Sequence, residues 1–264
     1  MTEIITSQRN DKVKYVRALQ SRRRVRQREQ RFVFEGMRLV EEAARAGIPP
    51  AFVFYTEPVE TDERGDRLLA LLREMNVPCY TVSGPVMAVC SDTDTPQGIL
   101  AVLPIPDLPC PERPTLTLIL DRVRDPGNLG AILRTALATG VDQVLLPPGT
   151  VDASNPKVVR AAMGAHLHLP VAALKWEALA EVVTGCDVWL AAVSGETVYT
   201  VVDWTRPVAL IVGSEATGAG ERAQALAQGQ VSIPMAAGVE SLNAATAAAV
   251  ILFETVRQRT AQAV

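Results

Sequence analysis

Two loops near the C-terminus contain the residues whose types and spacing point most directly to chemistry. The segment VALIVGSEATGAG (208–220) is an apolar run that ends at Gly213, and VSIPMAAGVESLNAATAAAVILFE (231–254) is a short strand-like run, a loop and an alanine-rich stretch. Each loop leaves a predicted strand and enters a predicted helix. Backbone N–H and C=O groups at two adjacent strand ends would then line a crevice, which predicts a small-ligand site.

The residues of the first loop argue against a phosphate ligand. Gly213 and Gly218 have the spacing of a phosphate-binding Walker loop, but Ala219 stands where its lysine should be, and the glycine order does not match GxGxxG. Glu215 lies inside the loop, where its carboxylate would repel phosphate and attract a positively charged ligand. S-adenosylmethionine, which has a sulfonium and an ammonium group, suits this loop better than ATP or NAD.

A third block lies upstream at TLTLILDRVRDPGNLGAILRTALATG (115–140). Asp125-Pro126-Gly127 predicts a tight turn, and Asn128 is a suitable N-cap for a helix over Leu129–Ala138. Arg134 would lie about two turns inside that helix, with a side chain long enough to reach back toward the loops. For either residue alone, the alternative is a plain cap or a solvated helix residue.

Together the three blocks resemble the SpoU-type (TrmH family) RNA ribose 2′-O-methyltransferases of the SPOUT class. The resemblance rests on DPGNLGAILRTA (125–136), IVGSEATGAG (211–220) and IPMAAGVESLNAATAAAVILFE (233–254). A weaker similarity lies in KVVRAAMGAHLHLPV (157–171), where Ala161 replaces the family's usual serine. The resemblance implies methyl transfer from S-adenosylmethionine to a ribose 2′-hydroxyl of structured RNA, with ribosomal RNA favoured over transfer RNA.

The resemblance also implies an assembly and a topology. It implies a homodimer and a trefoil knot at the C-terminus of a parallel-sheet domain. General rules of chain topology would not predict such a knot, because knots are nearly absent from proteins.

The same resemblance implies roles for particular residues. The implied catalytic residues are Arg134, Asn128, Ser241, Asn243 and Glu215. The implied cofactor-binding residues are Gly213, Ser214, Ile233, Met235 and Leu242, of which Ile233 and Leu242 would give an apolar floor for adenine.

Two alternatives stay open for how the implied catalytic residues act. Arg134 would be either the general base or, as a cation, a group that binds the target phosphate and stabilises a developing 2′-alkoxide. The second role suits a guanidinium, which is nearly always protonated in proteins. Asn128 and Asn243 would hold Glu215 by hydrogen bonds or orient the hydroxyl. Ser241 would cap the last helix or contact the substrate.

The elements that would position these blocks form two α/β domains joined by a linker. We expect an RNA substrate-binding domain over 1–103, a proline-rich linker over 104–114 and the methyltransferase domain over 115–264. In the first domain the predicted strands are Phe32–Phe34, Phe52–Tyr55, Cys79–Val82 and Ile99–Leu103, with helices over 36–46 and 64–75. In the second, strands are predicted near 115–121, 141–146, 165–171, 188–193, 208–213 and 231–235, with a last helix over 243–256. The resemblance implies that these strands form a parallel sheet.

Charge is concentrated near the N-terminus. Between Arg9 and Arg31 there are ten Lys or Arg residues and two acidic ones, whereas the whole chain has a net charge of −3. Such a basic segment predicts contact with a polyanion, and the alternative is a solvated helix face. The residues expected to meet RNA phosphates are Arg22, Arg23, Arg24, Arg26 and Arg28. Residues 5–43 also resemble the N-terminal substrate-binding domain of many SpoU-type enzymes, which is related to a ribosomal-protein fold, and DTDTPQGILAV (92–102) resembles its exit.

Other features limit the class of protein. Cys79, Cys90, Cys110 and Cys186 are scattered without a CxxC pair, so we expect buried thiols of a cytoplasmic protein and no metal site or disulfide. The polar N-terminus and the absence of a long apolar stretch predict neither a signal peptide nor a membrane span. No DNA partner is expected. His166 and His168 alternate on one side of a predicted strand without a third ligand, which favours a structural or RNA-facing role over metal binding.

Three competing functions remain at this stage. A noncatalytic RNA-binding protein would need the basic segment but not the set of Asn128, Arg134, Glu215 and Asn243. A nucleotide-dependent α/β enzyme would need a phosphate-binding loop, which is missing. Methylation of a base is a nearer rival, although the NLGAILRTA and SLN segments favour ribose. Neither the RNA nor the nucleotide can be identified from the sequence.

Overall fold

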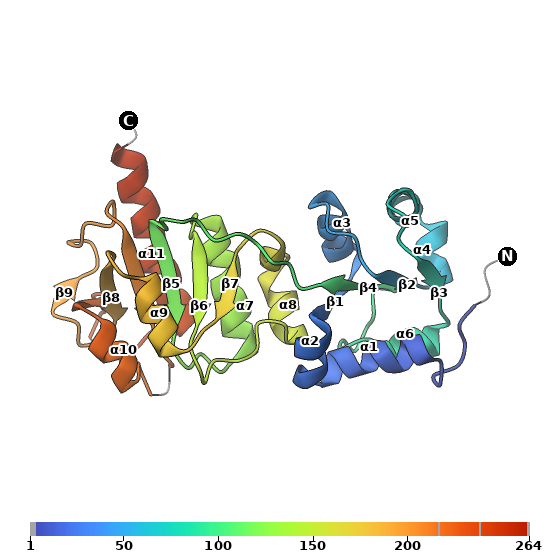
Figure 1. Ribbon diagram of the computed structural model, residues 1–264, viewed down its shortest axis with the longest axis horizontal. Helices are drawn as coiled ribbons and strands as arrows, with labels where there is room; N and C mark the ends of the chain where they lie inside the picture. The colour runs from blue at the N-terminus through green and yellow to red at the C-terminus, as the bar shows by residue number, and fades with distance from the viewer. Residues whose placement is uncertain (1–3, 216, 238, 263–264) are drawn as a thin grey trace. The chain divides into compact units, whose positions relative to one another are not determined.

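The computed structural model describes residues 4–215, 217–237 and 239–262, and the chain divides into two compact units (Figure 1). The first unit contains the chain up to Pro106 together with Ser154–Leu167. The second contains Asp107–Ala153 and the chain from His168 onward. We expected Ser154–Leu167 in the second domain. It belongs to the first because Val159 and Leu167 are buried in that unit's core.

The first unit has a four-stranded sheet that is buried on both faces. The strand order is β1 (Arg31–Glu35), β4 (Ile99–Pro104), β2 (Phe52–Tyr55) and β3 (Cys79–Thr81). β4 is antiparallel to both of its neighbours, and β2 is parallel to β3. Side chains alternate between two cores, as Phe32 and Phe34 on one face and Val33 on the other show.

Helices cover both faces of this sheet. α1 (Asp11–Ser21) and α6 (Gly84–Cys90) pack on the Val33 face, where Val13 and Val86 are buried. The opposite face is covered by α3 (Met37–Arg45), α4 (Glu57–Thr61), α5 (Glu63–Glu74) and α8 (Pro156–Ala162), which contribute buried residues such as Leu39 and Leu69. The short helix α2 (Arg23–Glu29) follows α1, so the basic segment consists mainly of two helices.

The second unit is built on a seven-stranded, fully parallel sheet, which confirms the predicted fold class. Its order is β7 (Val171–Ala173), β6 (Gln143–Leu146), β5 (Leu116–Leu120), β10 (Val208–Val212), β8 (Asp187–Ala191), β11 (Gly229–Ser232) and β9 (Thr197–Val198). Each pair of neighbouring strands in this order is parallel. The carboxyl ends of β5, β10, β8 and β11 therefore lie side by side. The trefoil knot stays a prediction.

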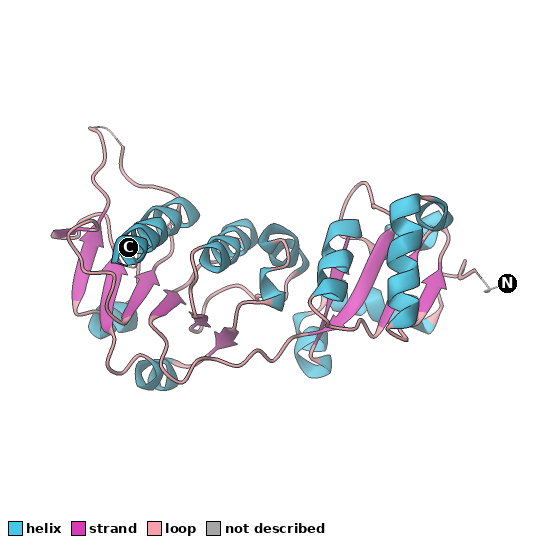
Figure 2. Ribbon diagram, turned by 90° about the horizontal axis from the view of Figure 1, so that it is seen from above, coloured by secondary structure: helices cyan, strands magenta, loops and turns pink. Residues whose placement is uncertain are grey.

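Two helix layers enclose the parallel sheet (Figure 2). On one side α9 (Trp176–Val182) and α10 (Glu221–Leu226) pack against Ile119 and Ile211. On the other, α7 (Pro126–Ala138) and α11 (Ala244–Gln262) pack against each other. Because both faces are covered, central strands such as VALIV are continuous apolar runs. No helix in the described part of the chain is long and apolar enough to cross a membrane.

The strand predicted over 165–171 is wrong. Ala165–Leu167 forms a 3₁₀ turn, η1, and β7 begins only at Val171. Met163 and Gly164 both have positive φ, +50° and +90°, which turns the chain out of α8 instead of extending it. The two histidines therefore do not share one side of a strand. His166 is buried, with its ring centroid 5.7 Å from that of Phe32, and His168 is exposed.

The four cysteines differ in exposure, and this difference is testable. Cys90 and Cys186 are buried and Cys79 is half-buried, but Cys110 is exposed, so the expectation of four buried thiols is wrong at Cys110. Burial raises the pKa of the Cys90 thiol to about 11, and only the thiolate reacts. At pH 8 we expect a maleimide to label Cys110 in the native protein, and Cys90 only after denaturation, by peptide mass spectrometry. Equal native labelling of both would contradict this packing.

Candidate active site

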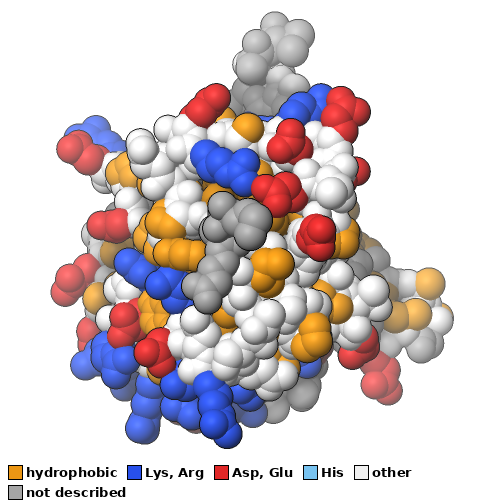
Figure 3. Space-filling view, turned by 90° about the vertical axis from the view of Figure 1, so that its right-hand side faces the viewer, with side chains coloured by type: hydrophobic (Ala, Val, Ile, Leu, Met, Phe, Trp, Pro, Cys, Tyr) orange, Lys and Arg blue, Asp and Glu red, His pale blue; other side chains and the backbone are white. Residues whose placement is uncertain are grey.

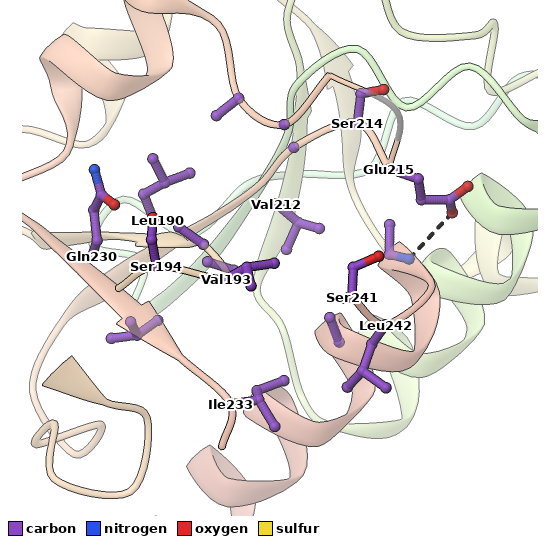
Figure 4. A pocket seen from close by; sticks show the side chains of 18 of the residues that line it. Leu190, Val193, Ser194, Val212, Ser214, Glu215, Gln230, Ile233, Ser241 and Leu242 are labelled. Atoms are coloured by element: carbon purple, nitrogen blue, oxygen red, sulfur yellow. Dashed lines mark hydrogen bonds between the residues drawn. The ribbon is translucent and has the colours of Figure 1, made fainter. Parts of the chain in front are cut away.

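A pocket of about 440 Å³ lies at the carboxyl edge of the parallel sheet in the second unit (Figure 4). Its wall is formed by the loops after β8, β10 and β11 and by the first turns of α11. The lining residues are 190–194, 212–215, 217–219, Gln224, Gln230, Val231, Ile233, Met235, Ser241, Leu242, Ala244, Ala247 and Ile251. Residues 213–215 and 217–220, the described part of the segment that joins β10 to α10, are called the cofactor loop below. The strand ends predicted to form a crevice do so.

All five predicted cofactor-binding residues line this pocket: Gly213, Ser214, Ile233, Met235 and Leu242. At Gly213 the cofactor loop folds back so closely that a Cβ would lie 2.6 Å from the Ala219 nitrogen, so only glycine fits. Ile233 and Leu242 supply apolar surface on one side of the pocket, and Gln230 and Ser194 supply polar groups on the other (Figure 4). The pocket wall thus combines apolar side chains with polar groups that could bind a ligand.

Glu215 is the centre of a hydrogen-bonded cluster that joins three segments. Its Oε1 accepts hydrogen bonds from Asn128 Nδ2, from Asn243 Nδ2 at 3.0 Å and from the Ala244 N–H at 3.2 Å. Asn243 Nδ2 also lies 3.0 Å from Asn128 Oδ1. The carboxylate sits at the N-terminus of α11, where the helix dipole favours a negative charge. Hydrogen bonding to Glu215, one of the two roles left open for the asparagines, is therefore present in the structure.

The helix caps differ from those expected. Asp125, not Asn128, caps α7: its Oδ1 accepts the Asn128 N–H at 2.8 Å, and Pro126 takes the first helical position. Asn128 therefore lies in the first turn, and its side chain bonds Glu215. At α11 the cap is Asn243, whose Oδ1 accepts the Ala245 N–H at 2.9 Å. Ser241 is left to line the pocket.

Arg134 is exposed on α7, outside the pocket wall. It follows Asn128 by six residues, about 9 Å along the helix axis. Within the described part of the chain, its guanidinium has no hydrogen bond or ion pair. The structure thus brings Asn128, Glu215 and Asn243 together beside the pocket and leaves Arg134 available to an external anion.

Sequence reasoning missed part of this site. Ser194 and Gln230 line the pocket because β8 and β11 are adjacent in the sheet. These two strands are not consecutive in the sequence, so no local sequence pattern predicts that they are neighbours. Asp121, the first residue after β5, is only 2% exposed, and its Oδ2 accepts the Gly220 N–H at 2.6 Å. The sequence pattern that could have identified Asp121 is an acidic residue directly after a buried apolar strand.

The basic segment of the first unit presents most, but not all, of the predicted arginines. Arg22, Arg23, Arg24 and Arg28 are exposed. Arg26 is 3% exposed, and its guanidinium donates to the Leu19 carbonyl at 2.8 Å and to Ser154 Oγ at 3.3 Å. Arg26 therefore supports packing within the first unit and is removed from the set expected to contact RNA.

Comparison with known proteins identifies both parts of the chain. Residues 115–253 match the model of the SpoU rRNA Methylase family, and residues 10–101 match the MRM3-like substrate binding domain. The chain is 35% identical over 253 residues to a 23S rRNA guanosine 2′-O-methyltransferase of Bacillus subtilis, covering 94% of this chain and 97% of the relative. It is 37% identical over 260 residues to an uncharacterized tRNA/rRNA methyltransferase of Synechocystis, covering 97% of this chain and 94% of the relative.

Solved structures resemble the chain over nearly its full length. An rRNA methyltransferase from Sinorhizobium meliloti superposes with a TM-score of 0.85 at 29% identity and covers 97% of both chains. A SpoU methyltransferase from Streptomyces viridochromogenes, crystallised in complex with AdoMet, gives a TM-score of 0.85 at 28% identity, covering 96% of this chain and 99% of that one.

Proposed function

The chain belongs to the SpoU rRNA methylase family, and from that premise we propose that it methylates a ribose 2′-hydroxyl of ribosomal RNA. The observation that carries the proposal is the pocket lined by Gly213 beside the cluster of Asn128, Glu215 and Asn243. The methyl donor in this family is S-adenosylmethionine, which supplies a methyl group on a sulfonium sulfur.

The residues present fit that cofactor. The volume of about 440 Å³ lies in the range of about 300–1,000 Å³ usual for small-molecule sites. Ile233, Leu242 and Met235 would face adenine, and the backbone at Gly213 allows the close approach that main-chain hydrogen bonds to a ligand require. Ser194 and Gln230 offer polar groups for the ligand's hydroxyl, amino or carboxylate groups.

We assign Arg134 an electrostatic role. Because its side chain is exposed and Arg is essentially always protonated in proteins, it would act as a cation and not as a base. In that role it would bind the phosphate of the target nucleotide and stabilise negative charge developing on the 2′-oxygen. Ser241, at the pocket wall, would hold the ribose in line with the methyl group.

The RNA would bind along α1 and α2. We define the basic surface as the exposed residues Arg9, Lys12, Lys14, Arg17, Arg22, Arg23, Arg24 and Arg28. Residues 36–76, which include α3 to α5, contain eight acidic and five basic residues, so these three helices would repel RNA. Figure 3 shows Lys and Arg side chains gathered along the lower edge of that view, where Figure 1 draws α1.

Removing part of the basic surface should weaken binding to RNAs of different sequence by the same factor, because phosphate contacts do not depend on base sequence. For the Arg23→Ala/Arg24→Ala variant we expect lower RNA affinity and an unchanged Kd for S-adenosylmethionine. The slope of log affinity against log salt should fall by roughly 0.7–0.9 for each phosphate that the variant no longer neutralises. The matched control is Arg45→Ala/Arg67→Ala, which removes two exposed arginines from α3 and α5. Equal losses of affinity in both variants, measured by filter binding over a salt series, would contradict the proposed surface.

We also propose that the enzyme is a cytoplasmic homodimer. The four cysteines are free thiols, which fits a reducing compartment. Leu137 on α7 and Phe253 on α11 are 37% and 54% exposed, and such a dimer would cover them. Light scattering should give twice the mass of the chain, and a monomer at micromolar concentration would contradict the dimer.

The function is tested with purified protein, labelled S-adenosylmethionine and unmodified total RNA. We expect calorimetry to show cofactor binding, and label to appear in the ribosomal RNA bands after separation by size. Label in the transfer RNA band would support RNA methylation but contradict ribosomal RNA as the substrate. Absence of both cofactor binding and label would leave a noncatalytic RNA-binding protein.

A further inference from the structure

We propose that Asp121 and Arg122, the two residues that follow β5, are positioning residues that hold the cofactor loop in its ligand-binding shape. The inference rests on the proposed function, because it assumes that the pocket binds S-adenosylmethionine. Neither residue lines the pocket, so both would act through the loop that does.

Asp121 joins the two ends of the cofactor loop. Its backbone N–H donates to the Val212 carbonyl at 2.9 Å, which extends the β5–β10 pairing to the residue just before the loop. Its Oδ2 accepts the Gly220 N–H at 2.6 Å, at the last residue of the loop. Since Asp121 is 2% exposed, water does not compete for this charge-assisted bond.

Arg122 contacts the second half of the cofactor loop, at Gly218. Its Nη2 donates to the Gly218 carbonyl at 3.4 Å, and its Nε lies 3.5 Å from Asp121 Oδ2. A Cβ at Gly220 would come within 3.0 Å of Nη2, so glycine there lets the guanidinium lie against the loop backbone. Arg122 has a φ of +56°, a conformation that a non-glycine residue adopts only when its surroundings impose it.

The segment 121–128 therefore holds the cofactor loop at two separate places. Asp121 and Arg122 hold Gly218 and Gly220, while Asn128 hydrogen-bonds Glu215 in the first half of the loop. A loop fixed in this way keeps its shape before the ligand arrives, which lowers the entropy cost of binding. Loss of the contacts made by Asp121 and Arg122 should then weaken cofactor binding and leave the rate of methyl transfer in the bound complex nearly unchanged.

The test compares Asp121→Ala and Asp121→Asn in the full chain. For Asp121→Ala we expect the Kd and KM for S-adenosylmethionine to rise about tenfold, as for loss of a hydrogen bond to a charged group. We expect kcat at saturating cofactor to stay within about threefold of wild type, a difference well below the tenfold effect expected on KM. Asp121→Asn, whose Oδ1 still accepts the Gly220 N–H, should recover most of the affinity.

The matched control is Asp142→Ala, the residue just before β6, whose side chain binds the N-terminal end of β5. Asp142 Oδ2 accepts the Thr115 and Leu116 N–H groups at 2.7 and 2.9 Å, so this variant loses comparable bonds at the edge away from the pocket. It should lower the melting temperature and leave the cofactor Kd unchanged. An equal rise in Kd for Asp142→Ala would show a merely structural effect and overturn the inference.

Further outcomes separate this inference from the proposed function. If the wild type binds cofactor and methylates RNA but Asp121→Ala has an unchanged Kd, only the positioning role fails. If the wild type does neither, the proposed function fails. Should Asp121→Ala not fold, Arg122→Ala takes its place: a raised cofactor Kd is expected, and an unchanged one overturns the inference.

Discussion

Replacing Arg134 with alanine is expected to lower kcat by about 10²- to 10³-fold, as for loss of one group that stabilises transition-state charge. Because Arg134 is exposed on α7 and lies outside the pocket wall, the Kd for S-adenosylmethionine should not change. Arg134→Lys should recover part of the rate, since it keeps the charge and loses the planar fork. Single-turnover methylation and calorimetry measure the two quantities.

The control for this variant is Arg206→Ala, which removes another exposed arginine of the same unit, at the edge of the sheet away from the pocket. It should leave kcat within about twofold of wild type, as expected for a surface substitution away from the site. An Arg134→Ala enzyme with wild-type kcat, or one whose only defect is a raised cofactor Kd, would contradict the assigned role.

Replacing Gly213 with alanine is expected to weaken cofactor binding about 10- to 100-fold, for a strain of about 1–3 kcal/mol. The added Cβ would lie 2.6 Å from the Ala219 nitrogen and 2.7 Å from the Gly218 carbonyl carbon. Both are backbone atoms, so no side-chain rotation relieves the contact and the cofactor loop must shift. Calorimetry with S-adenosylmethionine measures the loss of affinity.

Gly84→Ala is the control for the glycine substitution. A Cβ at Gly84, in the first unit, meets no atom within 4 Å, so the cofactor Kd should stay unchanged. An unchanged cofactor Kd in Gly213→Ala would show that cofactor binding does not depend on the present backbone conformation of the loop. This result would contradict the assignment of the pocket as the cofactor site.

The strands of the parallel sheet could be predicted because they carry their own signals, whereas the resemblance alone implied that they are parallel. β10 is the uninterrupted apolar run VALIV between Pro207 and Gly213, and a strand buried on both faces requires such a run. The strand near 165–171 failed because two consecutive positive-φ residues, Met163 and Gly164, turn the chain. Glycine is a known turn former, but a left-handed methionine has no sequence signal.

The identity of most site residues could be predicted, but their contacts in three dimensions could not. The resemblance grouped Glu215 with Asn128 and Asn243, and hydrogen bonds between the amides and the carboxylate were one of two roles left open for them. The part played by Asp121 depends on β10 lying beside β5, two strands separated by about 90 residues of chain, which no local pattern encodes.

The basic segment shows a further limit. Arg26 was grouped with its neighbours because all are arginines, yet it is buried and bonds the Leu19 carbonyl. The chain leaves the helical conformation at Arg22, between α1 and α2, so the periodicity of α1 does not carry over to Arg26. Charge counts locate a basic segment but do not show which of its side chains reach solvent.

The most direct test of ribose methylation is the identity of the methylated product. RNA labelled by the enzyme from methyl-labelled S-adenosylmethionine would be digested to nucleosides and separated by liquid chromatography with mass spectrometry. We predict that the label lies in a 2′-O-methyl nucleoside and is lost with Arg134→Ala. Label in a base-methylated nucleoside would contradict ribose methylation, and the site assignments for Arg134 and Ser241 would fall with it.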